Sequence, residues 1–440
     1  MIKRLLGDAK RYEAQIEHLH LKYLQKNRTY QVQQDGVAFA SINFDARRFS
    51  RRIADTVAAG EYRFTPAKTR ILHVGARERL LYQFQLTDLI VHGVVSTIIN
   101  EAMEPHLSPH LYSYRRGVRW WDAVSALARY VRVHQRMQPE IKARGLYVLR
   151  RDVSKYTDSI RVDARSEVWN QVWQALNGDR FMSRREHRYW ALVEQVIRPE
   201  IVSSEGLRYS NLVGVPTGSP ISTTLFNLYL MSVDRELDAI PGGFYARYSD
   251  DILFAHPDPH VTRLVDETLS RSLAAKGLKT NADKDQLLYF NGAGRPSRAW
   301  PRFRGTTQVA FLGCNVSFHG VISLNGRKMQ HLLKDVSTRA RRALAALEVM
   351  DRGVVGPTVC AAVNEALDPD SPARHKHAAL LRHVVTSRQQ LKEADYQIAR
   401  IVARSLTGSA SVKAFRQIPY QTMRRDWKLV SLCQARNKAS

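Results

Sequence analysis

The segment Phe244-Tyr-Ala-Arg-Tyr-Ser-Asp-Asp-Ile-Leu-Phe-Ala-His256 carries the clearest structural signal in the chain. Two apolar, aromatic-rich runs flank Ser249-Asp250-Asp251, and this pattern predicts a tight β-hairpin with two carboxylates at its tip. Adjacent carboxylates repel each other, and a divalent cation explains their presence because Mg²⁺ prefers carboxylate oxygens. An ordinary Asp-rich turn is the alternative, because Asp also favours turns for local reasons.

A further carboxylate lies at the end of a second predicted strand. The run Leu146-Tyr-Val-Leu-Arg-Arg-Asp-Val153 is apolar and β-branched, which predicts a buried strand ending near Asp152. An acid there is costly unless it binds a cation or accepts hydrogen bonds, as in a helix N-cap. Carboxylates from two separate strands form the set that a two-metal polymerase site needs.

A third element is the loop Gly214-Val-Pro-Thr-Gly-Ser-Pro-Ile-Ser222. Glycines such as Gly218 let the backbone approach a nucleotide or template closely. A plain loop is the alternative interpretation of this string.

The charge of the chain points to a polyanionic partner. Lys and Arg number 67 against 41 Asp and Glu, a net charge of +26, and nucleic acid is the commonest polyanion. Lys and Arg outnumber Asp and Glu about twofold after Gly326. The three cysteines form no CxxC pair, which argues against disulfide and zinc frameworks. No leader or membrane-spanning run is evident, so we expect a cytoplasmic protein.

Periodicity predicts strands mixed with helices, followed by helices alone. Extended structure is expected over 70–81, and a hairpin is expected to pair 309–314 with 321–324. This order indicates an α+β core with a helical C-terminal domain. Helices are expected at about 8–27, 88–103, 120–133, 166–176, 223–237 and 261–276, and throughout the region after Gly326.

Taken in order, these strings resemble the motifs of the reverse transcriptase family. The first begins at Asp152, the second is Gly214–Ser222 with Thr217 where the family usually has Gln, and the third is the YxDD box ending at Asp251. The string 277–284 resembles the fourth motif, and Phe311-Leu-Gly313 resembles the fifth. The resemblance implies a right-hand polymerase. Its parts would be an N-terminal helical segment (1–35), fingers (36–145), a palm of antiparallel sheet and helices (146–325), and a helical thumb with C-terminal extension (326–440).

The resemblance also implies residue roles. Two Mg²⁺ ions, with Mn²⁺ as the alternative, would bind Asp152, Asp250 and the Val153 carbonyl, with Asp251 in support. Lys284 would lie near the pyrophosphate, although a surface lysine is nearly as good an interpretation. The expected nucleotide-binding residues are Arg77, Arg79, Tyr156, Thr157, Gly218 and Lys284, and the expected RNA-binding residues are Arg341, Arg342, Arg424 and Arg425.

One position departs from the family pattern. Reverse transcriptases generally place an aromatic ring five residues after the first aspartate, where it excludes a ribose 2′-hydroxyl. That residue is Thr157 here, and the aromatic residue is Tyr156. Neighbouring side chains on a strand point to opposite faces. Two interpretations therefore stay open: Thr157 leaves room for ribonucleotides, or the strand ends in a turn and Tyr156 is the gate.

No segment suggests a ribonuclease H, HNH endonuclease, protease or integrase domain. The chain is most like compact bacterial reverse transcriptases of the defence-associated groups (unknown group and abortive infection), with retron enzymes next. The resemblance implies cDNA synthesis on a dedicated non-coding RNA in antiphage defence. Retron-type synthesis, template-independent or protein-primed synthesis, and a catalytically idle maturase-like protein are the alternatives.

Overall fold

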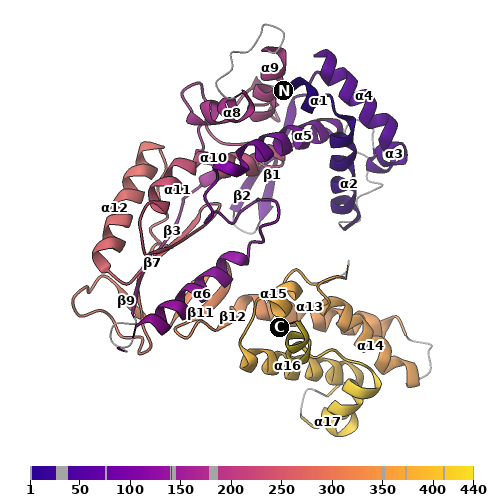
Figure 1. Ribbon diagram of the computed structural model, residues 1–440. Helices are drawn as coiled ribbons and strands as arrows, with labels where there is room; N and C mark the ends of the chain where they lie inside the picture. The colour runs from indigo at the N-terminus through magenta and orange to yellow at the C-terminus, as the bar shows by residue number, and fades with distance from the viewer. Residues whose placement is uncertain are drawn as a thin grey trace. The chain divides into compact units, whose positions relative to one another are not determined.

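The computed structural model describes residues 2–25, 38–74, 77–138, 140, 145–177, 187–347, 352–371, 374–409 and 412–439. These residues form two compact units (Figure 1). The first comprises Met1–Arg119, Leu149–Phe254 and His260–Gln286, and the second comprises Trp120–Val148, Ala255–Pro259 and Leu287–Ser440. The mixture of helices and strands confirms the α+β class. The predicted domain boundaries at 35, 145 and 325 do not coincide with the limits of these units, and they stay predictions.

The first unit is built around one apolar helix, α5 (Leu86–Met103), which is buried along most of its length. Helices α2, α8 and α10 pack against it. The helices of this unit are α1 (Ile2–Leu6), α2 (Ala9–Gln25), α3 (Phe39–Phe44), α4 (Ala46–Ala59), α5, η1 (Glu104–His106), α7 (Tyr156–Ser159), α8 (Glu167–Asn177), α9 (His187–Ile197), α10 (Ile221–Tyr229), α11 (Met231–Asp238) and α12 (Pro259–Ala275). The helix predicted over 223–237 is divided at Leu230 into α10 and α11. None of the described helices is long and apolar enough to cross a membrane.

A small sheet of the first unit has the strand order β2-β1-β4-β5. Its strands are β1 (Ala67–Val74), β2 (Arg77–Gln83), β4 (Ile201–Val202) and β5 (Arg208–Tyr209). The first two pair antiparallel from Lys68↔Gln83 to Val74↔Arg77. The extended segment predicted over 70–81 is therefore a hairpin.

A second sheet has five strands in the order β6-β7-β3-β8-β9. They are β3 (Leu146–Asp152), β6 (Phe244–Tyr248), β7 (Asp251–His256), β8 (Gln286–Phe290) and β9 (Arg304–Thr306). The strands predicted around Asp152 and Asp250 are confirmed. The expectation of an antiparallel sheet is wrong for one pair, because β8 and β9 run parallel from Leu288↔Arg304. Residues 291–303 connect the two strands, and they lead the chain back to the end of the sheet at which β8 begins.

The predicted pairing of 309–314 with 321–324 is wrong for most of the first run, although Cys314 does pair with Leu324. The strands β10 (Gln308–Phe311), β11 (Cys314–Ser317) and β12 (Ile322–Leu324) form an antiparallel meander. Leu312 and Gly313 both have positive φ, of 49° and 76°. Two consecutive residues of this kind make a two-residue hairpin turn, so the chain reverses inside the segment expected to be one strand.

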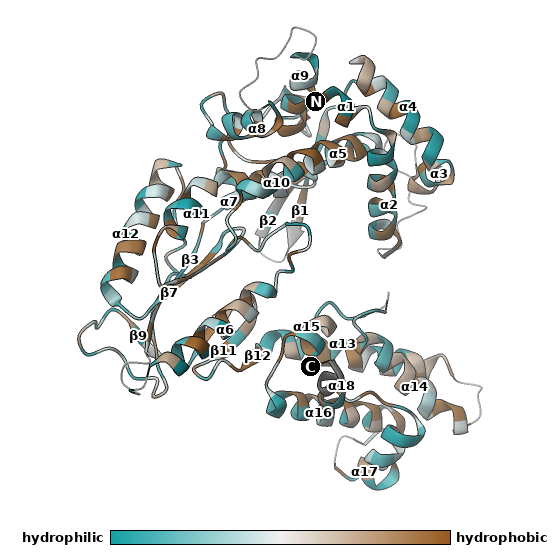
Figure 2. Ribbon diagram, viewed as in Figure 1, coloured by the Kyte–Doolittle hydropathy of each residue, from teal (hydrophilic) through white to brown (hydrophobic). Residues whose placement is uncertain are grey.

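The rest of the second unit is helical, as predicted. Its helices are α6 (Asp122–Met137), α13 (Gly326–Ala345), α14 (Arg352–Leu367), α15 (Ala378–His383), α16 (Arg388–Thr407), α17 (Ala414–Gln417), the π-helix η3 (Thr422–Asp426) and α18 (Leu432–Ala439). Helix α13 buries Leu332, Val336 and Ala340, four residues apart on one face. Figure 2 shows hydrophobic and hydrophilic residues interspersed along α12 and α16, as expected of helices that bury one face.

Strand β12 is held at its outer edge by the start of α16. The Gln390 side chain donates to the carbonyl of Leu324 and accepts from its amide, both at 2.7 Å. The Ile322 amide donates to Thr386 Oγ at 2.8 Å. These bonds satisfy backbone groups that an edge strand would otherwise leave unpaired.

Candidate active site

The two aspartates of the hairpin lie where β6 turns into β7. Ser249, at the turn, has a φ of 57°, a left-handed conformation that polar turn residues tolerate better than branched ones. The Asp250 carbonyl accepts a hydrogen bond of 3.0 Å from the Val153 amide, just beyond the end of β3. That bond joins the hairpin tip to the strand that carries Asp152.

The loop after α12 lies beside Asp152. The Asp152 carbonyl accepts from the Asn281 amide at 2.8 Å, and the Ser154 amide donates to the Lys279 carbonyl at 2.8 Å. This backbone pairing brings Lys284 to the carboxylate, where its Nζ lies 2.8 Å from both Asp152 oxygens. The lysine side chain is 59% exposed, so little packing holds it in place.

Asp251 has a cation of its own. Arg150, two residues before Asp152 on β3, donates from Nε at 3.1 Å and from Nη2 at 3.0 Å to its two oxygens. A bidentate guanidinium–carboxylate pair of this kind is geometrically specific. Sequence analysis missed Arg150, although its spacing from Asp152 places both side chains on one face of the strand.

For Asp250, in contrast, no described residue supplies such a paired cation. Burial raises the pKa of Asp250, and the negative charges of Asp152 and Asp251 raise it further. Concentrated negative charge on hard oxygen ligands fits a divalent cation. The positively charged Lys284 ammonium already binds both Asp152 oxygens, so this carboxylate attracts a cation in the structure. Even so, across the described residues no three His, Cys, Asp or Glu side chains are grouped closely enough to hold a metal. The metal site therefore stays a proposal.

Beneath the hairpin lies a buried ion pair that sequence analysis also missed. Arg247 on β6 is fully buried and donates to Asp234 on α11 from Nε at 2.7 Å and Nη2 at 2.6 Å. The same guanidinium donates to the carbonyls of Ser249 at 3.1 Å and Asn227 at 3.1 Å. Ser249 of the hairpin turn is thereby tied to two helices, α10 and α11. An arginine inside the apolar run Phe244–Tyr248 was the available signal, because a buried charge requires a partner.

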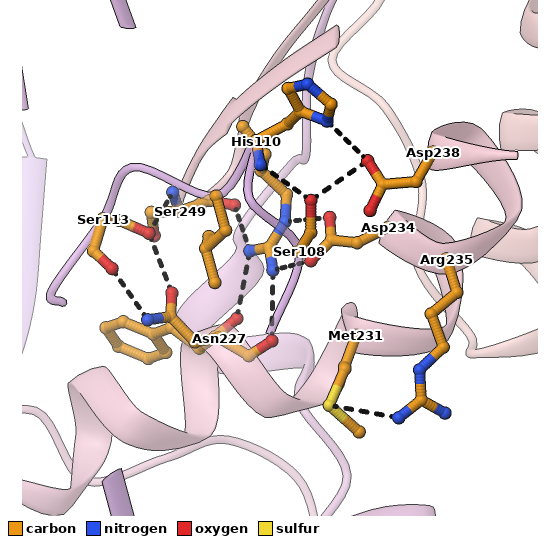
Figure 3. Close-up of polar contacts among 12 residues, drawn as sticks. Ser108, His110, Ser113, Asn227, Met231, Asp234, Arg235, Asp238 and Ser249 are labelled. Carbon is orange, nitrogen blue, oxygen red and sulfur yellow. Dashed lines mark hydrogen bonds and ion pairs between the residues drawn. The ribbon is translucent and has the colours of Figure 1, made fainter. Parts of the chain in front are cut away.

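A second tie to the turn comes from the chain before α6 (Figure 3). Ser113 Oγ accepts from the Ser249 amide at 3.0 Å and donates to Asn227 Oδ1 at 2.8 Å. The same segment is anchored to α11, since Asp238 Oδ1 lies 2.8 Å from His110 Nδ1 and accepts from Ser108 Oγ at 3.0 Å. The backbone just before Asp250 is thus fixed from two sides.

Residues 89–316, just over half of the chain, match the family described as reverse transcriptase (RNA-dependent DNA polymerase). The chain belongs to the reverse transcriptase family. A search of curated proteins finds no match.

The chain is similar to solved structures of two polymerases. One is telomerase from Candida albicans in complex with a TWJ fragment of telomeric RNA, at 12% identity over 81% of this chain and 63% of that chain, with a TM-score of 0.45. Another is the RNA-dependent RNA polymerase of a human picobirnavirus, at 12% identity over 85% of this chain and 65% of that chain, with a TM-score of 0.43. The chain thus spans less than two thirds of the length of either structure.

The glycine-containing loop 214–222 packs against strand β2. Gly218 has a φ of 114°, and a Cβ there would lie 2.8 Å from the Tyr82 carbonyl oxygen. Ser219 Oγ lies 2.7 Å from His92 Nδ1 on α5, and the Val215 amide donates to the Thr157 carbonyl at 2.9 Å. Position 218 therefore requires glycine because the loop backbone lies close to the backbone of β2. Nucleotide binding by Gly218 stays a prediction.

The two gate candidates are in different environments. Strand β3 ends at Asp152, Lys155 in the following turn has a φ of 46°, and α7 begins at Tyr156. The prediction of a turn is thus confirmed, and strand alternation does not apply. The Tyr156 ring is 3% exposed and its hydroxyl donates to the Phe226 carbonyl at 2.6 Å, so it belongs to the core. Thr157 is partly exposed, and the interpretation that it leaves room for a ribonucleotide stays a prediction.

The remaining predicted residues lie in the small sheet and the C-terminal helices. The backbones of Arg77 and Arg79 are in β2, but their side chains lie outside the described part of the chain. Arg341 and Arg342 are exposed on α13. Arg425 is also exposed.

Arg424 differs from the other three arginines. It donates to Tyr420 Oη at 2.9 Å and to the Leu429 carbonyl at 2.5 Å, and it lies 3.4 Å from the Asp395 carboxylate. Only 15% of its side chain is exposed. These contacts give Arg424 a structural role in the helical region.

Proposed function

We propose that this chain is an RNA-directed DNA polymerase that adds deoxynucleotides to a primer 3′ end. Membership of the reverse transcriptase family supports the proposal. The observation that carries it is the junction of β3 and the hairpin, where the Val153 amide binds the Asp250 carbonyl. This bond brings two carboxylate-bearing chain segments together at one end of the sheet, as nucleotidyl transfer requires.

Asp152, Asp250 and the Val153 carbonyl would hold two Mg²⁺ ions, with Mn²⁺ as the alternative. Such ions activate the 3′-hydroxyl and stabilise the phosphate during in-line displacement. Asp251 supports the site from its pair with Arg150, which occupies both of its oxygens.

Lys284 has two positions in this proposal. Without a divalent cation its ammonium neutralises Asp152. With the carboxylate engaged elsewhere, the exposed side chain is free to turn toward the leaving pyrophosphate and donate a proton to it. Arg77, Arg79 and Gly218 are proposed to contact the incoming nucleotide.

The test replaces each proposed ligand by its neutral isostere. We expect Asp152→Asn and Asp250→Asn each to lower primer extension by at least about a thousandfold, because the charge that holds the cation is lost. Asp55→Asn, an exposed position on α4, is the matched control and should extend normally. Thermal unfolding checks that all three proteins fold. Metal-dependent extension by either site variant at the wild-type rate refutes the assignment.

We further propose that the template is a cognate non-coding RNA and that the enzyme acts in antiphage defence in the cytoplasm. The resemblance to defence-associated bacterial reverse transcriptases and the basic helical region after Gly326 support this. Purifying the protein from its host and sequencing the bound nucleic acid tests it. We expect one RNA to be enriched with the wild-type protein and to be lost when Arg341 and Arg342 are both replaced by Gln. Recovery of bulk cellular RNA in proportion to abundance contradicts a dedicated template.

A further inference from the structure

A cavity of about 700 Å³ lies in the first unit, and none of the proposed catalytic residues lines it. It is formed by the chain between α7 and α8, by the adjoining ends of α10 and α11, and by the C-terminal half of α12. Four cations line it: Arg161, Arg165, Arg271 and Lys276. This volume falls in the range of small-molecule sites, roughly 300–1,000 Å³.

Two of these cations already have carboxylate partners. Arg161 donates to Asp163 Oδ2 from Nε at 2.9 Å and from Nη2 at 2.5 Å. Lys276 forms an ion pair with Glu167. These pairs are internally neutral, so they shape the cavity without adding net charge to it.

The guanidinium groups of the other two cations, Arg165 and Arg271, form no hydrogen bond or ion pair with any described residue, and both arginines are exposed. The nearest carboxylate to Arg165 is that of Asp163, which accepts from the Arg165 amide at 2.9 Å and from the Arg161 guanidinium. The lining residue Glu236 is the remaining anion, and it accepts a hydrogen bond of 2.6 Å from Ser272 Oγ. Two unpaired guanidinium groups from separate elements thus face one cavity with an excess of positive charge.

We propose that this cavity binds a phosphate-bearing ligand. A guanidinium group presents two parallel donors that match phosphate oxygens, and the serine hydroxyls of the wall add further donors. The phosphate has two sources, a free nucleotide polyphosphate or the backbone of a bound RNA. The site goes beyond the proposed polymerase function and does not depend on it.

The experiment measures binding in metal-free buffer with EDTA at constant ionic strength. One arm titrates tripolyphosphate, and the other titrates a short oligouridylate. The test variant is Arg165→Gln/Arg271→Gln. The control variant is Arg235→Gln/Arg263→Gln, which changes the charge equally on α11 and α12 at positions outside the cavity. Calorimetry gives the affinity, and the unfolding temperature without ligand confirms folding.

Wild type and control are expected to bind alike, and the test variant at least about tenfold more weakly, because two charge-assisted contacts are lost. If the test variant loses affinity for tripolyphosphate, the ligand is a free polyphosphate. If it loses affinity for the oligouridylate alone, the ligand is an RNA backbone. Equal affinity of all three proteins, or no binding of either probe, overturns the proposal. Because no catalysis is measured, such a failure leaves the polymerase assignment to its own test.

Discussion

Replacing Arg247 by Met should destabilise the protein more than any surface change. The arginine is fully buried and gives two hydrogen bonds to Asp234. It also donates to three backbone carbonyls, those of Phe226, Asn227 and Ser249. A methionine keeps part of the volume and removes every donor, leaving a buried carboxylate whose remaining described hydrogen bond comes from Tyr245.

The expected loss can be worked out from these contacts. Removing one member of a buried ion pair costs about 3–5 kcal/mol, because the other charge stays buried without compensation. The carbonyls that lose their donors add to this. We therefore expect the free energy of unfolding to fall by about 4 kcal/mol or more. The free energy of unfolding of a whole protein is about 5–15 kcal/mol, so the expected loss is a large fraction of the total stability.

The assay is denaturant unfolding of four proteins: wild type, Arg247→Met, Asp234→Asn and the double variant. The double variant should be more stable than the sum of the two single losses predicts, since it leaves no uncompensated charge. Arg263→Met is the control, because its ion pair with Glu267 is exposed and contributes at most about 1 kcal/mol. Equal losses for Arg247→Met and Arg263→Met, or strictly additive losses in the cycle, refute the reasoning.

Three further predictions concern the gate, the core and RNA binding. Thr157→Phe should lower ribonucleotide incorporation at least about tenfold relative to deoxynucleotides in primer extension, and strict deoxynucleotide use by wild type would count against an open gate. Burial lowers the pKa of His92 to about 3, so the unfolded chain binds a proton below its ordinary pKa near 6.5 whereas the folded protein does not. Stability should therefore decline as the pH falls below about 6.5, by about 2 kcal/mol at pH 5, and His92→Gln should flatten that decline in unfolding curves. Replacing Arg341, Arg342 and Arg425 by Gln should reduce the slope of log affinity for RNA against log salt by up to about 3, and an unchanged slope would exclude these arginines from phosphate contact.

The hairpin and its neighbouring strand could be predicted because their signals are local. Apolar runs bounded by turn residues specify β6, β7 and β3 without reference to any distant residue. The meander at Leu312-Gly313 shows the limit of this approach. An apolar run continues through the turn there, and only the backbone conformation reveals the reversal.

The partners of the site residues could not be predicted in the same way. Lys284 and Asp152 are 132 residues apart, and Arg150 and Asp251 are 101 apart. Their meeting depends on which strands become neighbours in the sheet, and no local pattern encodes that order. The position of Tyr156 could not be predicted from a local pattern either. Lys155, directly before it, has a left-handed conformation, and the Tyr156 ring lies in the core.

The α+β class, the reverse transcriptase motifs and the three aspartates of the proposed site could all be predicted from the amino-acid sequence. Side-chain chemistry and short-range periodicity are enough for those conclusions. The folded structure was needed to show that Lys284 pairs with Asp152 and Arg150 with Asp251, that Arg424 is held within the helical region, and that Arg247 ties the hairpin turn to two helices. Each of these depends on desolvation, since a buried charge must find its partner across the fold and the chain between the partners carries no sign of it.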